Sequence, residues 1–127
     1  MLAYLDGEPA AQQVRQVLRK ARNKHALVLF SLINYGECLY VTEREQGLQQ
    51  AQRAAGIIDQ LALRIVPTDR PLVFAAAHIK ARYPVSYADA FAIAIAKRTG
   101  GRVMTGDPEF KTVESEVSVQ WLPKTQN

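Results

Sequence analysis

Residues 87–96 read YADAFAIAIA, a stretch that predicts a helix buried at the centre of the fold. Its side chains are apolar on nearly every side of a helix, which is typical of a helix enclosed by other elements. Asp89 carries the only charge in the stretch. Ser86 lies three residues earlier, so the pair fits a capping box in which aspartate replaces the usual glutamate or glutamine. Two interpretations of Asp89 stay open: a residue that stabilises the helix start, or a buried functional acid.

Short apolar runs on either side of this helix predict strands at residues 26–30, 64–66, 102–105 and 117–121. Helical patterns fill the intervals, and parallel strands need such crossover connections. The sequence therefore predicts an α/β fold, a three-layer α/β/α sandwich with a central parallel sheet, formed by residues 1–127 as a single domain.

The ends of the predicted helices follow from local signals. Ser31 can cap the second helix, either Thr68 or Asp69 can cap the fourth, and Gly100 closes the helix that contains Asp89. The predicted long helices cover residues 9–21, 31–44, 48–62, 68–83 and 87–98.

The composition of the chain limits which kinds of partner and which cell compartment we expect. The chain has 127 residues, 48% of them hydrophobic, and a net charge of +4, which favours a polyanionic partner without identifying one. Cys38 is the one cysteine and cannot pair within the chain, and no apolar run approaches the roughly 20 residues of a membrane span. The sequence thus predicts a cytoplasmic protein with no membrane segment. The largest basic cluster, most simply the solvated face and end of a helix, comprises Arg19, Lys20, Arg22 and Lys24.

Two further acids follow predicted strands. Glu37 lies in the helix that Ser31 opens, on a largely apolar face. It is either a rim charge that reaches solvent or an arginine, or a functional acid. Asp107 follows the strand at residues 102–105, where it can be an N-cap or a ligand at the carboxyl edge of the sheet, with the Thr105 hydroxyl beside it.

Glu37, Asp89 and Asp107 come at three successive crossover points, so we expect them to crowd negative charge at one rim of the sheet. Like charges in one site raise one another's pKa values unless a cation neutralises them. Oxygen ligands alone suit Mg²⁺ or Mn²⁺, whereas zinc would call for histidine or cysteine. His25 and His78 lack the spacing of a zinc site and are predicted to be a loop residue and a helix-surface residue.

Four motifs in order resemble those of VapC-type PIN domains. They are LAYLDGEPA at residues 2–10, Ser31-x-x-Asn34-x-Gly36-Glu37, SYADA at residues 86–90 and TGDPEF at residues 105–110. Each motif is weak alone, but four in order at appropriate spacing are specific. The resemblance covers essentially the whole chain.

The resemblance implies a parallel sheet with flanking helices and an acidic cluster that holds one or two Mg²⁺ or Mn²⁺ ions. It places metal-ligand or catalytic roles on Glu37, Asp89 and Asp107, with Thr105 and Asn34 as supporting residues. It also implies an RNA substrate, a cognate antitoxin protein whose peptide covers the acidic site, and a homodimer.

The chain departs from the family pattern at its start. The family normally opens with an apolar strand that ends in an aspartate, whereas Met1 already lies past that position. Asp6 is no replacement, because it belongs to the segment that follows. We therefore expect a PIN-like fold with its first strand missing. Three explanations for the missing strand remain open: a start site placed too far downstream, a truncated remnant, or pairing with another chain that fills the gap. The intact remaining motifs favour the misplaced start site.

The leading functional hypothesis is a metal-dependent endoribonuclease that cleaves RNA phosphodiester bonds as the toxin of a type II toxin–antitoxin pair. The alternative is a catalytically inactive, truncated PIN domain that binds RNA or an antitoxin. A flavodoxin-like ligand-binding or phospho-acceptor domain is a weaker third, because the sequence lacks a glycine-rich phosphate loop.

Overall fold

A computed structural model describes residues 10–123 of the chain. The N-terminal motif up to Pro9, with Asp6, and the strand expected ahead of it lie outside the described residues. Within residues 10–123, no helix is long and apolar enough to cross a membrane. In chain order the elements are α2 (Ala10–Arg22), β1 (Leu29–Ser31), α3 (Leu32–Gln46), α4 (Leu48–Gln60), β2 (Arg64–Val66), α5 (Arg70–Arg82), α6 (Tyr87–Thr99), β3 (Arg102–Thr105), the 3-10 helix η1 (Pro108–Val113) and β4 (Ser118–Trp121).

The described strands form two parallel pairs rather than one continuous sheet. In the first pair β1 lies beside β2, from Leu29 opposite Arg64 to Ser31 opposite Val66. In the second pair β3 lies beside β4. The predicted α/β fold with parallel strands is confirmed. The single central sheet is not formed by residues 10–123, because no ladder joins β1 to β3 there, and α6 instead contacts both strands.

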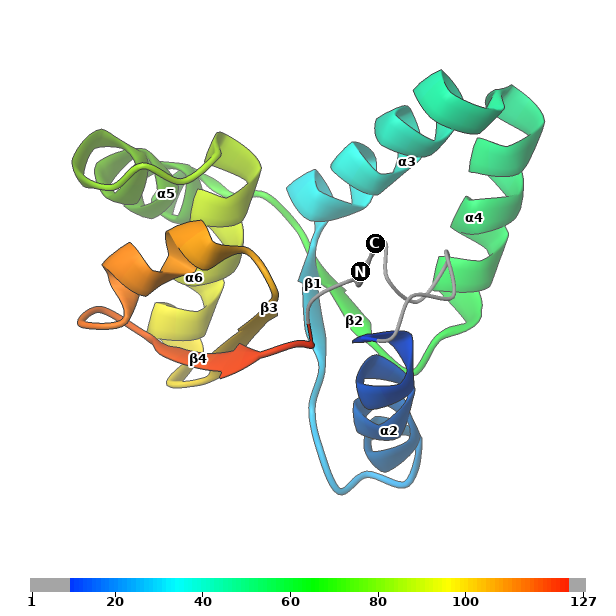
Figure 1. Cartoon of the computed structure of the whole chain (residues 1–127), viewed down its shortest axis with the longest axis horizontal. Coiled ribbons are helices and arrows are strands. Elements are labelled where there is room, and N and C mark those ends of the chain that lie inside the picture. Colours follow the sequence, from blue (N-terminus) through cyan, green and yellow to red (C-terminus); the bar gives the residue numbers. More distant parts are fainter. Residues whose placement is uncertain (1–9, 124–127) are drawn as a thin grey trace.

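Figure 1 shows how the helices surround the two strand pairs. α5, α6, β3 and β4 form one lobe, and β1 and β2 run alongside it. α3 and α4 form a helical hairpin at one end of the β1–β2 pair, while α2 lies at the other end. The carboxyl end of β1 leads directly into α3, so the end with the hairpin is where a site at the carboxyl ends of the strands would lie.

Local signals place most boundaries where the sequence predicts them. The Ser31 side chain caps α3, and Asp69 rather than Thr68 caps α5 by accepting a hydrogen bond from the Leu72 N–H at 2.9 Å. The strand predicted at residues 26–30 begins only at Leu29, because its partner β2 is three residues long. The residues ahead of β1 lie at the surface, and Leu27 is 66% exposed.

The main hydrophobic core is built around α6. Ala90 and Ile93 of α6 have no exposed surface, and Phe91 is 2% exposed. Leu72 of α5 and Val113 of η1 pack in the same cluster. The predicted burial of the helix at residues 87–96 is therefore confirmed, and the lobe depends on it for its apolar contacts.

α2 ends in a Schellman motif that carries an unusual residue. The His25 N–H donates to the Lys20 carbonyl and the Lys24 N–H to the Ala21 carbonyl, at 2.8 Å and 3.0 Å. Lys24 takes the left-handed conformation, with φ 63°, where glycine or asparagine is the usual choice. A residue with a Cβ atom pays roughly 1–2 kcal/mol for that conformation.

Glu116 holds the segment after η1 against the ends of α5 and α6. Its carboxylate accepts hydrogen bonds from Arg82, from the Tyr83 hydroxyl at 3.1 Å and from Lys97. The hydrogen bonds from Lys97, Arg82 and Tyr83 lower the pKa of Glu116 from 4.5 to about 2.

The Glu116 contacts predict a pH-dependent contribution to stability. A carboxylate whose pKa is depressed in the folded state stabilises it above the unfolded-state value of 4.5, and this contribution is lost as the pH falls toward about 2. The urea midpoint of Glu116→Gln should therefore lie below that of the wild type at pH 7, and the difference should shrink between pH 4.5 and pH 2. Glu114→Gln, at an exposed neighbouring position, should match the wild type. A difference that stays constant with pH would contradict the ionic origin.

Candidate active site

Asp89 lies in the first turn of α6, and both interpretations of it have support. Its backbone N–H donates to Ser86 Oγ at 3.1 Å, which is the cap expected from the sequence. The carboxylate is half-buried, and burial raises its pKa above the ordinary value. Repulsion from Asp107 and Glu109 raises the pKa further, while a hydrogen bond with the Ser86 side chain opposes the rise. The cap therefore uses the backbone of Asp89, and its carboxylate lies in an acidic environment.

Glu37 approaches Asp89 from α3. It is partly buried, and burial is the main cause that raises its pKa, followed by repulsion from Asp89. Within residues 10–123, the carboxylates paired with Lys or Arg are those of Glu116 and Asp69. Glu37 and Asp89 thus carry a charge that no cation in the described part of the chain compensates. The interpretation of Glu37 as the partner of an arginine is not met there.

Asp107 lies after β3, where the sequence predicts an N-cap. Its Oδ1 accepts a hydrogen bond from the Glu109 N–H at 2.9 Å, and its own N–H donates to Thr105 Oγ1 at 3.1 Å. The turn is further held by the Leu122 N–H, which donates to the Thr105 carbonyl at 2.8 Å. Thr105 thus fixes the backbone that presents Asp107, which fits a supporting role.

Asn34 joins α3 to the start of α6. Its Nδ2 donates to the Ala88 carbonyl at 3.2 Å, and its Oδ1 accepts a hydrogen bond from Ser31 Oγ at 2.6 Å. The carbonyl belongs to the residue next to Asp89, and Asn34 lies one helical turn before Glu37. Because its amide is engaged on both sides, Asn34 positions the two helices that carry these acids.

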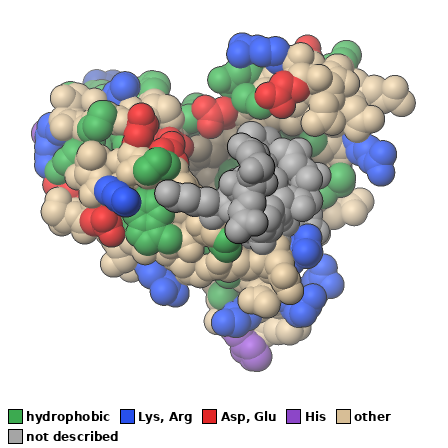
Figure 2. All heavy atoms as spheres, in the orientation of Figure 1, with side chains coloured by type: hydrophobic (Ala, Val, Ile, Leu, Met, Phe, Trp, Pro, Cys, Tyr) green, Lys and Arg blue, Asp and Glu red, His purple; other side chains and the backbone are tan. Residues whose placement is uncertain are grey.

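The predicted acids come together as a chain of neighbours rather than as one cluster. Asp89 raises the pKa of Glu37, and Asp107 raises the pKa of Asp89, so Asp89 interacts with both of the other acids. Among the described residues, no three acidic, histidine or cysteine side chains converge closely enough to form a metal-binding group. Figure 2 shows acidic side chains where the lobe of α5 and α6 faces the start of α3.

Glu109 is an acid near Asp89 that the sequence prediction missed. It lies in the first turn of η1 and contributes to the raised pKa of Asp89. The sequence could have indicated Glu109, because it is the second acid of the Asp107-Pro108-Glu109 turn. The two histidines take no part, because His25 and His78 are both exposed, as predicted.

Comparison with known proteins identifies the family. The family model described as PIN domain matches residues 1–116. The chain belongs to the PIN domain family. The resemblance of the four motifs to PIN domains is therefore confirmed at the level of this family. None of the curated proteins is significantly similar to this PIN domain.

Solved structures share the fold. A chain of the DNA-bound VapBC structure from Salmonella typhimurium superposes with a TM-score of 0.64 at 20% identity, over 84% of this chain and 82% of that chain. A toxin–antitoxin complex from Klebsiella pneumoniae gives 0.63 at 15% identity, over 94% and 88%. VapBC-1 from nontypeable Haemophilus influenzae gives 0.63 at 15% identity, over 88% and 83%. At these identities the likeness establishes the fold.

The raised pKa of Asp89 predicts that its charge costs stability. The folded state holds the proton more tightly than the unfolded state, so ionised Asp89 destabilises the fold above its folded-state pKa, and the cost disappears as the pH falls below the ordinary 3.8. In EDTA at pH 7, Asp89→Asn should raise the free energy of unfolding measured by urea denaturation, by no more than about 1 kcal/mol because solvent screens the half-exposed charge. Glu45→Gln, an exposed acid on α3, is the control. A lower midpoint for Asp89→Asn would favour a purely capping role.

The hydrogen bonds of Asn34 predict a loss of stability when they are removed. Asn34→Ala leaves the Ala88 carbonyl and Ser31 hydroxyl without this partner, which should lower the free energy of unfolding by about 1–2 kcal/mol. Urea denaturation measures the loss. Asn23→Ala, at the exposed end of α2, is the matched control, and equal losses in both variants would contradict the bridging role.

Proposed function

We propose that this PIN domain is a metal-dependent endoribonuclease that cleaves RNA phosphodiester bonds. The observation that carries the proposal is the row of carboxylates in a chain of this family: Glu37 follows β1, Asp107 follows β3, and Asp89 lies in the first turn of α6. Structural or capping roles explain single members of the row. They do not explain why two helices bring together acids that make no ion pair within residues 10–123, in a partly buried place and at a cost in stability.

The donor chemistry of the site fits a hard divalent cation. Glu37, Asp89 and Asp107 offer oxygen ligands alone, which suits Mg²⁺ or Mn²⁺ and not zinc. Burial raises the pKa values of Glu37 and Asp89, repulsion from Asp89 raises that of Glu37 further, and repulsion from Asp107 and Glu109 raises that of Asp89. A bound cation would offset this repulsion. We assign the metal-holding role to these three residues and the positioning roles to Asn34 and Thr105.

The residues named above have different roles in the proposed reaction. A divalent metal supplies activation of water and neutralises charge on the scissile phosphate. Asp89 and Glu37 repel an RNA phosphate when the site holds no cation, so a phosphate would approach these two acids only when a cation is bound. Asn34 keeps the starts of α3 and α6 together, and Thr105 keeps Asp107 at the end of β3.

The structural neighbours support a biological setting for this activity. They come from VapBC and toxin–antitoxin complexes. We propose that this chain is likewise the toxin of a type II pair, acts in the cytoplasm, forms a homodimer, and is inhibited by a cognate antitoxin protein that covers the acidic row.

An inactive PIN domain that binds RNA or an antitoxin is the second candidate. The observation that favours it is the absence, within residues 10–123, of three converging metal-ligand side chains. Such a protein would have the PIN fold and the net positive charge of the chain, but it would not cleave RNA.

Nuclease assays of the full chain on a single-stranded RNA separate the candidates. The wild type should cleave with Mn²⁺ or Mg²⁺ and not with EDTA, and Asp89→Asn and Glu37→Gln should each slow cleavage on the order of 100-fold or more, because each removes a charged ligand. Glu45→Gln should cleave like the wild type. Mn²⁺ should also raise the melting temperature of the wild type more than that of Asp89→Asn.

Two outcomes would count against the nuclease. Cleavage that survives EDTA and the Asp89→Asn change would exclude the metal mechanism. RNA binding without cleavage, together with no Mn²⁺-dependent rise in melting temperature, would establish the binding protein instead.

A further inference from the structure

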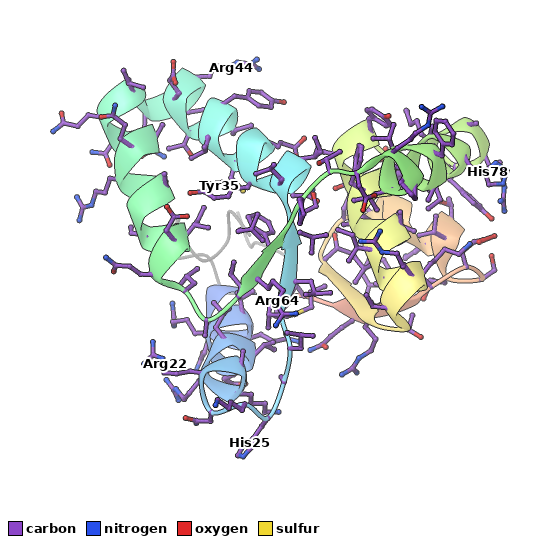
Figure 3. The ribbon with its side chains drawn as sticks, turned by 180° about the vertical axis from the view of Figure 1, so that it is seen from behind. Arg22, His25, Tyr35, Arg44, Arg64 and His78 are labelled. Atoms are coloured by element: carbon purple, nitrogen blue, oxygen red, sulfur yellow. The ribbon has the colours of Figure 1, made fainter. Side chains whose placement is uncertain are left out.

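A basic depression lies at the end of the molecule away from the acidic row. It is an open surface hollow of about 350 Å³, formed by the end of α2, the segment before β1 and the turn before β2. Arg22, Lys24 and Arg64 line it together with the aliphatic side chains of Leu27, Ala62 and Leu63. Figure 3 shows Arg22, His25 and Arg64 gathered around α2, across the β1–β2 pair from α3. The depression is therefore at the amino ends of these strands, and Asn34 and Glu37 follow the carboxyl end.

The charge of this region is of one sign. Residues 9–36 contain five lysines and arginines and neither aspartate nor glutamate, so this segment alone exceeds the net charge of +4 of the whole chain. In Figure 2, the lower projection displays basic side chains and a histidine on the visible face. Arg22, Lys24 and Arg64 are all exposed, and none of them takes part in an ion pair within residues 10–123.

Lys24 adds an observation that is independent of net charge. It occupies the left-handed position of the Schellman motif, with φ 63°, where glycine would be free of strain. A strained residue that stability does not require is a sign of a functional constraint. The left-handed turn forms part of the wall of the depression. Lys24 therefore lowers stability through its backbone conformation and also contributes a positive charge to the depression.

We propose that this depression binds the phosphodiester backbone of single-stranded RNA, as an anchor remote from the acidic row. The proposal rests on the proposed function in taking RNA as the polyanionic partner. Exposed cations that make no ion pair in the described part of the chain attract phosphates, and binding releases the counterions of the RNA. Such binding depends on salt and not on base sequence. The floor is aliphatic, with no aromatic ring among its lining residues, so it offers no platform for base stacking.

The position of the anchor complements that of the acids. Glu37, Asp89 and Asp107 repel the RNA backbone until a cation is bound, whereas the far end attracts it at once. β1 is three residues long and spans about 10 Å, so the anchor and the acidic row contact different nucleotides of one strand. RNA held at the anchor extends beyond the phosphate that is cut.

Equilibrium binding of the full chain to a fluorescent single-stranded RNA of about 20 nucleotides, in EDTA and over a series of salt concentrations, tests the anchor without cleavage. The test variant combines Arg22→Gln, Lys24→Gly and Arg64→Gln. The matched control removes the same charge from exposed sites elsewhere, with Arg53→Gln, Lys80→Gln and Arg102→Gln. For single-stranded RNA, each phosphate contact contributes about 0.7 to the slope of log affinity against log salt concentration. Loss of three contacts should therefore reduce the slope of the test variant by about 2 and weaken RNA binding at least tenfold. The control should change the slope by less than about 0.5.

Lys24→Gly alone separates binding from folding. Because glycine relieves the left-handed strain, its melting temperature should equal or exceed that of the wild type, while RNA binding should weaken. Equal losses of RNA affinity in the test and control variants would overturn the proposal. So would unchanged RNA affinity accompanied by a changed oligomeric state in sedimentation, which would make the depression a protein interface.

Parallel cleavage assays with Mn²⁺ keep this inference distinct from the nuclease proposal. A chain that binds RNA through the depression but never cuts it would support the anchor and exclude the nuclease. A chain that cuts RNA, and whose test variant binds RNA like the wild type, would support the nuclease and exclude the anchor.

Discussion

The burial of α6 is the constraint on which the rest of the structure depends. α3, α5, β1 and β3 all contact this helix, and its small side chains let these neighbours approach closely. Because no ladder joins the two strand pairs within residues 10–123, the contacts of α6 join them instead. A helix enclosed in this way can carry a charge only near its end, and Asp89 lies in the first turn, where the carboxylate is half-buried.

The same burial gives the acidic row its chemical character. An exposed acid at a helix start would have an ordinary pKa and a favourable interaction with the helix dipole. Here, burial and repulsion from neighbouring acids raise the pKa values of Asp89 and Glu37, so the charges of these two acids are costly. Asn34 holds this arrangement in place, because it bonds to the α6 backbone beside Asp89 and to the cap of its own helix. The fold thus keeps these acids near one another at some cost in stability, which is a common feature of functional sites.

Charge of opposite sign lies at the two ends of the β1–β2 pair. Glu37 follows the carboxyl end, and Arg22, Lys24 and Arg64 surround the amino end. The net charge of +4 is therefore an average over two unlike surfaces rather than a property of either. A polyanion meets an attractive surface and a repulsive one on the same molecule, and a divalent cation would reduce the negative charge of the repulsive one alone.

The sequence by itself determined the elements, their caps and the identity of the acids. The strands at residues 64–66 and 102–105, the buried helix after Ser86 and the family motifs all depend on local pattern, which a short window contains. Tertiary structure decided what depends on distant contacts: the two separate strand pairs, the shortening of β1 to the length of β2, and the approach of Glu109 to Asp89. It also gathered Arg64 to the end of α2. Sequence pattern cannot give these, because they are set by which side chains meet when segments tens of residues apart pack together.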